Sequence, residues 1–241
     1  MTKELAGRVA IVTGAGRNIG RGIALALAAG GAAVVVNARS NLQEAEAVAS
    51  EIERAGGKAF GVTADVADVE AVQKMVAAAA ARFGGIDILV NNAAVRAEQA
   101  FENMTLAQWR AVTSIILDGA FNCVQACLPY LKKSGAGAIV NIGGLSAHTG
   151  AARRPHVVTA KAGLIGFTRA LAHELADGRA VEERQPHLRG GAHEPLSRGD
   201  IEEKFVLNAR HGGWDAARTK RALALLRTLY DGKLDLSSLR G

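Results

Sequence analysis

The stretch Thr13-Gly14-Ala15-Gly16-Arg17-Asn18-Ile19-Gly20 decides the fold expected for this chain. It ends a short β-branched run and opens directly into an Ala-rich helical pattern. Glycines at such a turn let the backbone approach a pyrophosphate, and the N-terminus of the following helix offers free N–H groups and a positive dipole. A tight strand-to-helix connection without a ligand is the alternative interpretation. The position of the turn after a first buried strand favours nucleotide binding.

Outward from this turn, β-branched runs alternate with longer Ala-rich helical patterns as far as about residue 177. This alternation predicts an α/β, Rossmann-like fold, a doubly wound parallel sheet with helices on both faces. Strands are expected near Val9–Thr13, Ala33–Asn37, Ala59–Thr63, Ile88–Asn91 and Ala138–Ile142. Helices are expected near Ile19–Ala29, Leu42–Ala55, Val69–Phe83, Leu106–Lys132 and Val157–Ala176. Thr105 followed by Gln108 predicts a capping box at the start of the fourth helix.

The pattern changes after Ala176-Asp177-Gly178, where charged and turn residues replace it until a helical pattern resumes at about Ile201. We therefore expect a dinucleotide-binding domain over 1–178 and an atypical tail over 179–241. In this tail, apolar residues recur at helical spacing from about Ala216 to Tyr230, which predicts packing onto the same domain or a partner subunit.

Composition narrows the classes of function. The formal net charge of +6 is dispersed over 241 residues and no aromatic-basic stripe accompanies it, so a nucleic-acid partner is not expected. No apolar run reaches the roughly 18 residues of a membrane span, and the first residues lead into a strand instead of a signal-peptide core. A cytoplasmic protein without a membrane partner is the expectation. Cys123 and Cys127 are too few for a zinc site and are expected in the core, so no metal is predicted.

Further motifs follow the glycine turn in order, namely Asp65-Val66, Asn91-Asn92-Ala93-Ala94 and Lys161-Ala162-Gly163. The turn is not G-x-G-x-x-G. It resembles the T-G-x-x-x-G-x-G turn of the short-chain dehydrogenase/reductase family, with Asn18 where the middle glycine usually stands. The ordered motifs extend this resemblance over about residues 1–178.

The resemblance implies a nicotinamide dinucleotide site. It implies contacts to the pyrophosphate from Gly14, Asn18, Ile19 and Gly20, to the adenine from Asp65 and Val66, and to the adenosine ribose and its neighbouring chain from Asn91 and Ala93. Simpler interpretations also exist, because Asp65 could cap a helix and the Asn pair could make a turn.

Cofactor choice depends on charge at the end of the second strand. The position that is acidic in NAD-preferring relatives resembles Ala38 here, followed by Arg39, with Arg17 available from the glycine turn. Two cations and no carboxylate predict NADP(H) in preference to NAD(H). Arg39 as a solvated loop cation is the alternative.

Members of this family resemble one another in a catalytic set of Asn, Ser, Tyr and Lys, with Tyr and Lys on one helix face at a spacing of four. Lys161 matches the lysine, but Val157, Gly144 and Ile116 stand at the Tyr, Ser and Asn positions. Loss of a general acid typically lowers the rate by about 10²- to 10⁴-fold.

Ser146, His148, His156 and Thr159 lie near the expected site, and a histidine with a pKa of about 6.5 could supply a proton. His156 precedes Val157 and is expected to point about 100° away from it on a helix. Structural or surface roles are the alternative for all four residues.

The leading hypothesis is an NADP(H)-dependent oxidoreductase acting on a small-molecule carbonyl/alcohol pair. Lys161 would position the nicotinamide ribose, and Ser146, His148 or water would manage the carbonyl proton. A non-catalytic NADP(H)-binding or assembly protein and a recombined, non-functional product are the alternatives. Family resemblance also implies a homodimer or homotetramer formed through the helices at 106–132 and 157–176.

The tail resembles the C-terminal piece of the 2-methylcitrate dehydratase-like family. This resemblance rests on Ala176–Arg179, Gly191–Ser197, Ile201–Phe205 and Asp235–Leu239. It covers too little of that family to transfer an activity.

Overall fold

The computed structural model describes residues 3–175 and 214–227, together with Ser197, Gly199, Glu202, Phe205, Val206 and Ala209. The chain divides into two compact units, Met1–Ala180 and Val181–Gly241. The sequence boundary expected near residue 178 lies outside the described residues, as do the tail segments that resemble the dehydratase-like family, apart from Ser197, Glu202 and Phe205.

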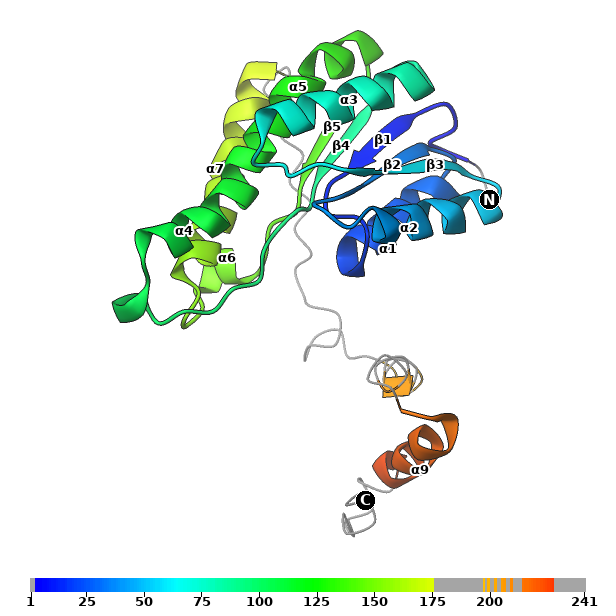
Figure 1. Ribbon diagram of the computed structural model, residues 1–241, viewed down its shortest axis with the longest axis vertical. Helices are drawn as coiled ribbons and strands as arrows, with labels where there is room; N and C mark the ends of the chain where they lie inside the picture. Colours follow the sequence, from blue (N-terminus) through cyan, green and yellow to red (C-terminus); the bar gives the residue numbers. More distant parts are fainter. Residues whose placement is uncertain are drawn as a thin grey trace. The chain divides into compact units, whose positions relative to one another are not determined.

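The first unit is built on a five-stranded sheet with the order β3-β2-β1-β4-β5, in which every pair of neighbours is parallel (Figure 1). Its strands are β1 (Val9–Val12), β2 (Ala33–Ala38), β3 (Lys58–Thr63), β4 (Ile88–Asn91) and β5 (Ala138–Asn141). The chain moves outward from β1 to β3 and then returns to place β4 on the other side of β1. Ligands of open α/β sheets bind outside the carboxyl ends of the strands at such a reversal.

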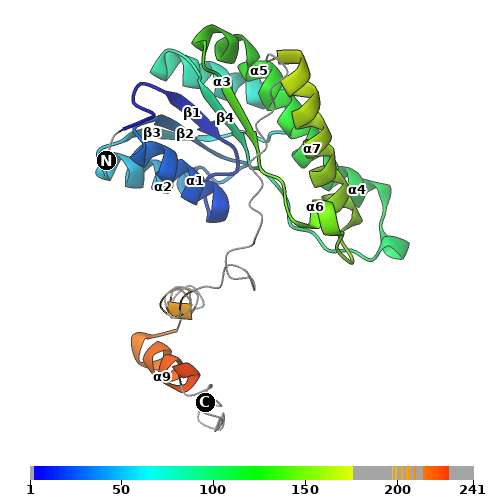
Figure 2. The same cartoon turned by 180° about the vertical axis from the view of Figure 1, so that it is seen from behind.

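Helices cover both faces of this sheet (Figures 1 and 2). They are α1 (Asn18–Ala29), α2 (Leu42–Arg54), α3 (Val69–Phe83), α4 (Leu106–Thr113), α5 (Gly119–Ser134), α6 (Ser146–Thr149) and α7 (Pro155–Leu175). Alternate strand residues feed two separate cores, so that Val34 and Val36 pack with α1 and α2 while Val35 packs with α3 and α5. The predicted doubly wound α/β fold is confirmed.

The predicted fourth helix is interrupted. A π-helical segment, η2 (Ser114–Asp118), separates α4 from α5, whereas the sequence predicted one continuous helix over 106–132. The capping box of Thr105 and Gln108 is present at the start of α4. Two short elements, η1 (Phe101–Asn103) and α6, were not predicted, because three or four residues carry no readable periodicity.

The helical segment Leu106–Ser134, which includes η2, has 29 residues and contains an 18-residue window with a mean hydropathy of 1.4, so it is long and apolar enough to cross a membrane by length and composition alone. Val112 and Ile116, however, pack with residues of α7, and other buried residues, in α5, pack into the sheet core. Cys123 and Cys127 of α5 are both fully buried there, as predicted, and burial raises the pKa of the Cys123 thiol to about 12. This packing is typical of the core helix of an α/β domain.

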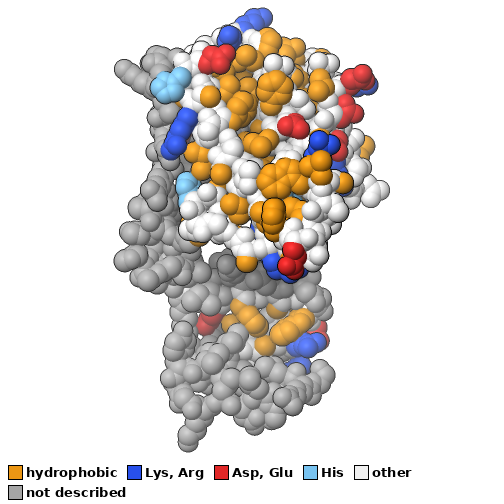
Figure 3. All heavy atoms as spheres, turned by 90° about the vertical axis from the view of Figure 1, so that its left-hand side faces the viewer, with side chains coloured by type: hydrophobic (Ala, Val, Ile, Leu, Met, Phe, Trp, Pro, Cys, Tyr) orange, Lys and Arg blue, Asp and Glu red, His pale blue; other side chains and the backbone are white. Residues whose placement is uncertain are grey.

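Among the described residues, β5 pairs only with β4, and Val140 within it is 44% exposed. Apolar side chains also gather on the face of the first unit shown in Figure 3, where the helices on the left-hand side of Figure 1 face the viewer. Phe121 of α5 is 48% exposed. In the second unit, α9 (Ala216–Arg227) falls within the helix predicted for Ala216–Tyr230, whose last residues lie outside the described ones.

Candidate functional site

A cleft of about 940 Å³ lies at the carboxyl ends of the strands, where the strand order reverses. It brings together eleven residues that the sequence predicted for the site: Gly14, Arg17, Asn18, Ile19, Gly20, Arg39, Asp65, Val66, Ala93, Ser146 and Lys161. Two predicted site residues, Asn91 and His148, do not line it.

The glycine turn brings the start of α1 against the end of β1. A Cβ atom on Gly20 would lie 2.3 Å from the Gly14 carbonyl oxygen and 2.5 Å from Nδ2 of Asn92, so no larger residue fits there. Asn18 has a φ of 51°, in the left-handed region that asparagine tolerates better than most residues. This conformation explains how Asn18 replaces the glycine that usually stands at its position.

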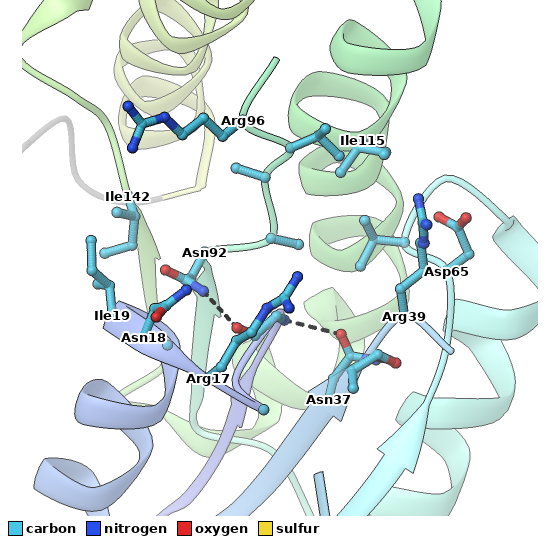
Figure 4. Close-up of a pocket in the computed structure, with 18 of the residues that line it drawn as sticks. Arg17, Asn18, Ile19, Asn37, Arg39, Asp65, Asn92, Arg96, Ile115 and Ile142 are labelled. Carbon is cyan, nitrogen blue, oxygen red and sulfur yellow. Dashed lines mark hydrogen bonds between the residues drawn. The ribbon is translucent and has the colours of Figure 1, made fainter. Parts of the chain in front are cut away.

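Asn92 and Thr13 join the ends of β4 and β1. The Asn92 amide donates to the carbonyl oxygens of Thr13 (2.8 Å) and Gly14 (3.1 Å), as Figure 4 shows for Gly14. The Thr13 hydroxyl accepts hydrogen bonds from the backbone N–H groups of Asn92 and Ala93, each at 3.0 Å. The sequence motifs include Thr13 and Asn92 but do not predict this role. The role is similar to the alternative in which the Asn pair makes a turn.

Asn37 at the end of β2 supports the same turn. Its Oδ1 accepts from the Gly14 N–H at 3.2 Å (Figure 4), and its amide donates to the carbonyl of Ala64 at 3.1 Å. The side chain is 1% exposed. It was also missed, because a buried asparagine in an apolar strand carries no motif.

Asn91 lies beside the cleft lining and is 6% exposed. Its amide donates to Oδ1 of Asn141 at 2.8 Å, and the Asn141 amide donates to the Thr168 hydroxyl at 2.9 Å. Its own Oδ1 is buried and has no partner within the described part of the chain. Contact between Asn91 and a ribose therefore stays a prediction.

Asp65 and Arg39 lie on the same side of the cleft (Figure 4). Asp65 accepts from the backbone N–H of Ala67 at 3.0 Å, while the N-cap of α3 is Asp68. The interpretation of Asp65 as a helix cap is therefore wrong. Arg39 is exposed and follows β2, as the sequence placed it.

The other side of the cleft holds Lys161, which is only 7% exposed. Its ammonium donates to the main-chain carbonyl of Ile142, and burial lowers the pKa of Lys161 to about 8. Val157, one helical turn earlier on α7, also lines the cleft. The lysine is thus present and buried, and an aliphatic side chain stands at the position that the family resemblance matched to the tyrosine.

The two residues that the family resemblance matched to the serine and the asparagine, Gly144 and Ile116, also carry no polar side chain. Gly144 lines the cleft, and a Cβ atom there would approach no heavy atom more closely than the Ser146 hydroxyl oxygen, at 3.9 Å. Ile116 lies in the π-helical segment, is 2% exposed and packs in an apolar cluster with residues such as Ala160.

The two histidines near the site differ. His148 is exposed on α6. His156 is 1% exposed and lines a separate cavity of about 240 Å³ against α4, with Nδ1 unpartnered within the described residues. His156 and Val157 thus line different cavities, which agrees with the predicted divergence of these neighbours on the helix.

The family described as short chain dehydrogenase matches residues 8–182. The chain belongs to the short-chain dehydrogenase family.

Three relatives illustrate the similarity. The 3-oxoacyl-(acyl-carrier-protein) reductase FabG of Staphylococcus aureus is 40% identical over 167 residues, which are 69% of this chain and 68% of the relative. The 3-oxoacyl-(acyl-carrier-protein) reductase of Synechocystis sp. is 41% identical over 172 residues, 71% of this chain and 70% of the relative. Nodulation protein G of Azospirillum brasilense is 40% identical over 169 residues, 70% of this chain and 69% of the relative.

Membership of the short-chain dehydrogenase family implies a nicotinamide cofactor, and the residues present fit one. Gly20 leaves no room for a side chain in the turn, and the start of α1 offers backbone N–H groups to an anion. The polar groups of the lining and the cleft volume of about 940 Å³ suit a dinucleotide.

Proposed function

We propose that this chain is a cytoplasmic, NADP(H)-dependent oxidoreductase that acts on a carbonyl/alcohol pair through an atypical active site. The observation that carries the proposal is the single cleft shared by the Gly14–Gly20 turn and the buried Lys161. A dinucleotide held at the turn would extend along this cleft toward the lysine.

The proposed placement of the cofactor follows the chemistry of the lining. Gly14, Asn18, Ile19 and Gly20 would hold the pyrophosphate at the positive end of α1. Asp65 and Val66 would contact the adenine, and Ala93 with Asn91 the adenosine ribose.

The preference for NADP(H) rests on Arg39 and Arg17. Both are exposed cations that line the cleft, Arg39 follows β2, and Ala38 leaves no carboxylate beside it to repel a 2′-phosphate. Glu44 also lines this part of the cleft, but it lies on α2, beyond the end of β2.

When bound, the cofactor would supply or accept a hydride. Lys161 would hold the nicotinamide ribose, and its ammonium would favour negative charge developing on a carbonyl oxygen nearby. Ser146 lines the cleft and His148 does not. Ser146 or water is therefore the better candidate to exchange a proton with the carbonyl oxygen.

The test is consumption of NADPH by the purified chain with a panel of aldehydes, ketones and 3-oxo esters. Lys161→Ala should abolish turnover and weaken NADPH binding, whereas Lys74→Ala, an exposed lysine on α3 outside the cleft, should change neither. Unchanged turnover in Lys161→Ala would contradict the proposed role.

A second candidate function is a non-catalytic NADP(H)-binding or assembly protein. Val157 and Gly144 in the cleft favour it, because neither side chain can donate a proton. It predicts tight NADPH binding with no consumption by any substrate of the panel.

Members of the family are often oligomers, and we propose that this chain forms a homodimer or homotetramer through α5 and α7. The apolar face of Figure 3 and the half-exposed Phe121 support this arrangement. Phe121→Glu should then shift the mass measured by light scattering toward the monomer.

A further inference from the structure

Positive charge gathers at the lysine end of the cleft. Arg96 from the loop after β4 and Arg154, the residue before α7, both line the cleft with Lys161. Figure 4 places Arg96 on the side of Ile142, whose carbonyl binds Lys161, while Arg39 and Asp65 lie across the cleft.

One carboxylate, that of Glu98, partners both arginines. Arg154 donates to Oε1 of Glu98 from Nε at 3.0 Å and also from Nη2, and Nη2 of Arg96 lies 3.8 Å from the same oxygen. Hydrogen bonds and charge from Arg154, with further charge from Arg96 and Arg153, hold the pKa of Glu98 below its ordinary value. Within the described residues around this end, a positive charge excess therefore remains.

The backbone holds this cluster in place. Arg153 has a φ of 61°, an uncommon conformation for a residue other than glycine, and its carbonyl accepts from the Gln99 N–H at 2.7 Å. This bond ties the segment before α7 to the loop that carries Arg96 and Glu98. The Arg154 side chain is only 28% exposed, so its guanidinium is positioned before any ligand arrives.

The cofactor does not account for the excess of positive charge at this end of the cleft. Its pyrophosphate is assigned to the Gly14–Gly20 turn and its 2′-phosphate to Arg39 and Arg17. A concave site lined by unbalanced cations raises the local concentration of anions, and a guanidinium matches the two oxygens of a carboxylate.

We propose that Arg154 and Arg96 bind the carboxylate of an oxo acid or hydroxy acid, so that the substrate of this chain is anionic. That the bound anion is a substrate rests on the proposed oxidoreductase function. The binding of an anion does not. Glu98 sets the affinity of the site for an anion, because it neutralises part of the positive charge beside which the ligand carboxylate would bind.

The experiment compares 4-oxopentanoate with its uncharged methyl ester. Binding is measured by calorimetry on the chain alone and with NADPH, and NADPH consumption is followed with both compounds. We expect the acid to bind about 10-fold or more tightly than the ester, since a charge-assisted pair is worth at least that much.

Three variants sharpen the test. Arg154→Gln should remove most of the preference for the acid, and Glu98→Gln should increase it. Lys74→Gln makes the same charge change as Arg154→Gln on the exposed side of α3 and should leave the preference unchanged. If Arg154→Gln does not fold, Glu98→Gln still decides, because loss of an exposed carboxylate should strengthen the binding of an anion only if the site is real.

Equal binding of acid and ester, or a preference that Arg154→Gln and Glu98→Gln leave unchanged, would overturn the inference. Selective binding of the acid without NADPH consumption would support the anion site and count against the oxidoreductase. Consumption of NADPH with the ester as readily as with the acid would support the oxidoreductase and overturn the anion site.

Discussion

The Lys161 ammonium donates to the carbonyl of Ile142 and thereby ties α7 to the residue that follows β5. No other hydrogen bond or ion pair of this ammonium is present within the described part of the chain. Lys161 is only 7% exposed, and burial lowers its pKa to about 8.

Lys161→Met should reveal this burial as a pH-dependent difference in stability. Burial lowers the pKa of Lys161 from 10.5 to about 8 in the folded chain, so between these values the unfolded state binds more protons. The free energy of unfolding of the wild type, relative to Lys161→Met, should therefore rise from pH 8 to pH 10.5 by up to about 3 kcal/mol. Urea unfolding across this range measures it. Lys74→Met should show no such rise, and an equally flat result for Lys161→Met would contradict the burial effect.

Val157→Tyr combined with Gly144→Ser should raise NADPH-dependent reduction of a carbonyl. Tyrosine at 157 lies four residues before Lys161 on α7, and the space beside Gly144 accepts a serine side chain. A restored general acid should increase kcat by about 10²- to 10⁴-fold over the wild type. Val157→Phe with Gly144→Ser is the matched control, since it has the ring without the hydroxyl. Equal rates for the two double variants would show that the phenol is not the missing group.

Gly20→Ala should abolish cofactor binding, because its Cβ atom would lie 2.3 Å from the Gly14 carbonyl oxygen. Gly22→Ala on the same helix meets nothing within 4 Å and should instead stabilise α1 by about 1 kcal/mol. Thermal unfolding and NADPH titration of both variants measure the contrast. Normal NADPH affinity in a folded Gly20→Ala would show that the turn is not the binding site.

Asp87→Asn should destabilise the chain at neutral pH. Burial raises the pKa of Asp87, but hydrogen bonds from Ser134 (2.5 Å), the Val9 N–H (2.8 Å) and Arg8 (3.1 Å) outweigh it and keep the pKa below 3.8. The free energy of unfolding of the variant should be lower by about 1–3 kcal/mol, because the asparagine amide places a hydrogen-bond donor where the surrounding groups are themselves donors.

The pH dependence of this loss has a defined sign. A lowered carboxyl pKa stabilises the fold above pH 3.8, and the contribution disappears as the pH falls through the folded-state value. The difference between wild type and Asp87→Asn in urea unfolding should therefore shrink below pH 3.8. A difference that stays constant down to pH 2 would assign the loss to packing.

The sheet was predictable because short β-branched apolar runs alternate with longer Ala-rich helical patterns along the chain. The register and the two cores were not predicted, because a run such as Val34–Val36, buried on both faces of the sheet, has no alternation that assigns Val35 to a different core from its neighbours. The interruption at Ser114–Asp118 was not predictable, because a π-helical turn keeps the composition of the helices around it.

The residues of the candidate site were likewise predictable only in part. The glycine turn and Lys161 carry motifs with fixed spacing, so the sequence singled out both, and both line the cleft. Arg96 and Arg154 were missed, because single arginines in loops look like solvated charges until the fold brings them to one carboxylate, that of Glu98. Asn37 and Thr13 were missed because their hydrogen bonds cross between strands distant in sequence.

The most direct test of the central claim is titration of the chain with NADPH and, separately, with NADH, followed by nicotinamide fluorescence. Micromolar NADPH binding, weaker NADH binding, and selective loss of NADPH affinity in Arg39→Ala are the results predicted. A folded chain that binds neither cofactor would contradict the assignment of the cleft and with it the oxidoreductase function.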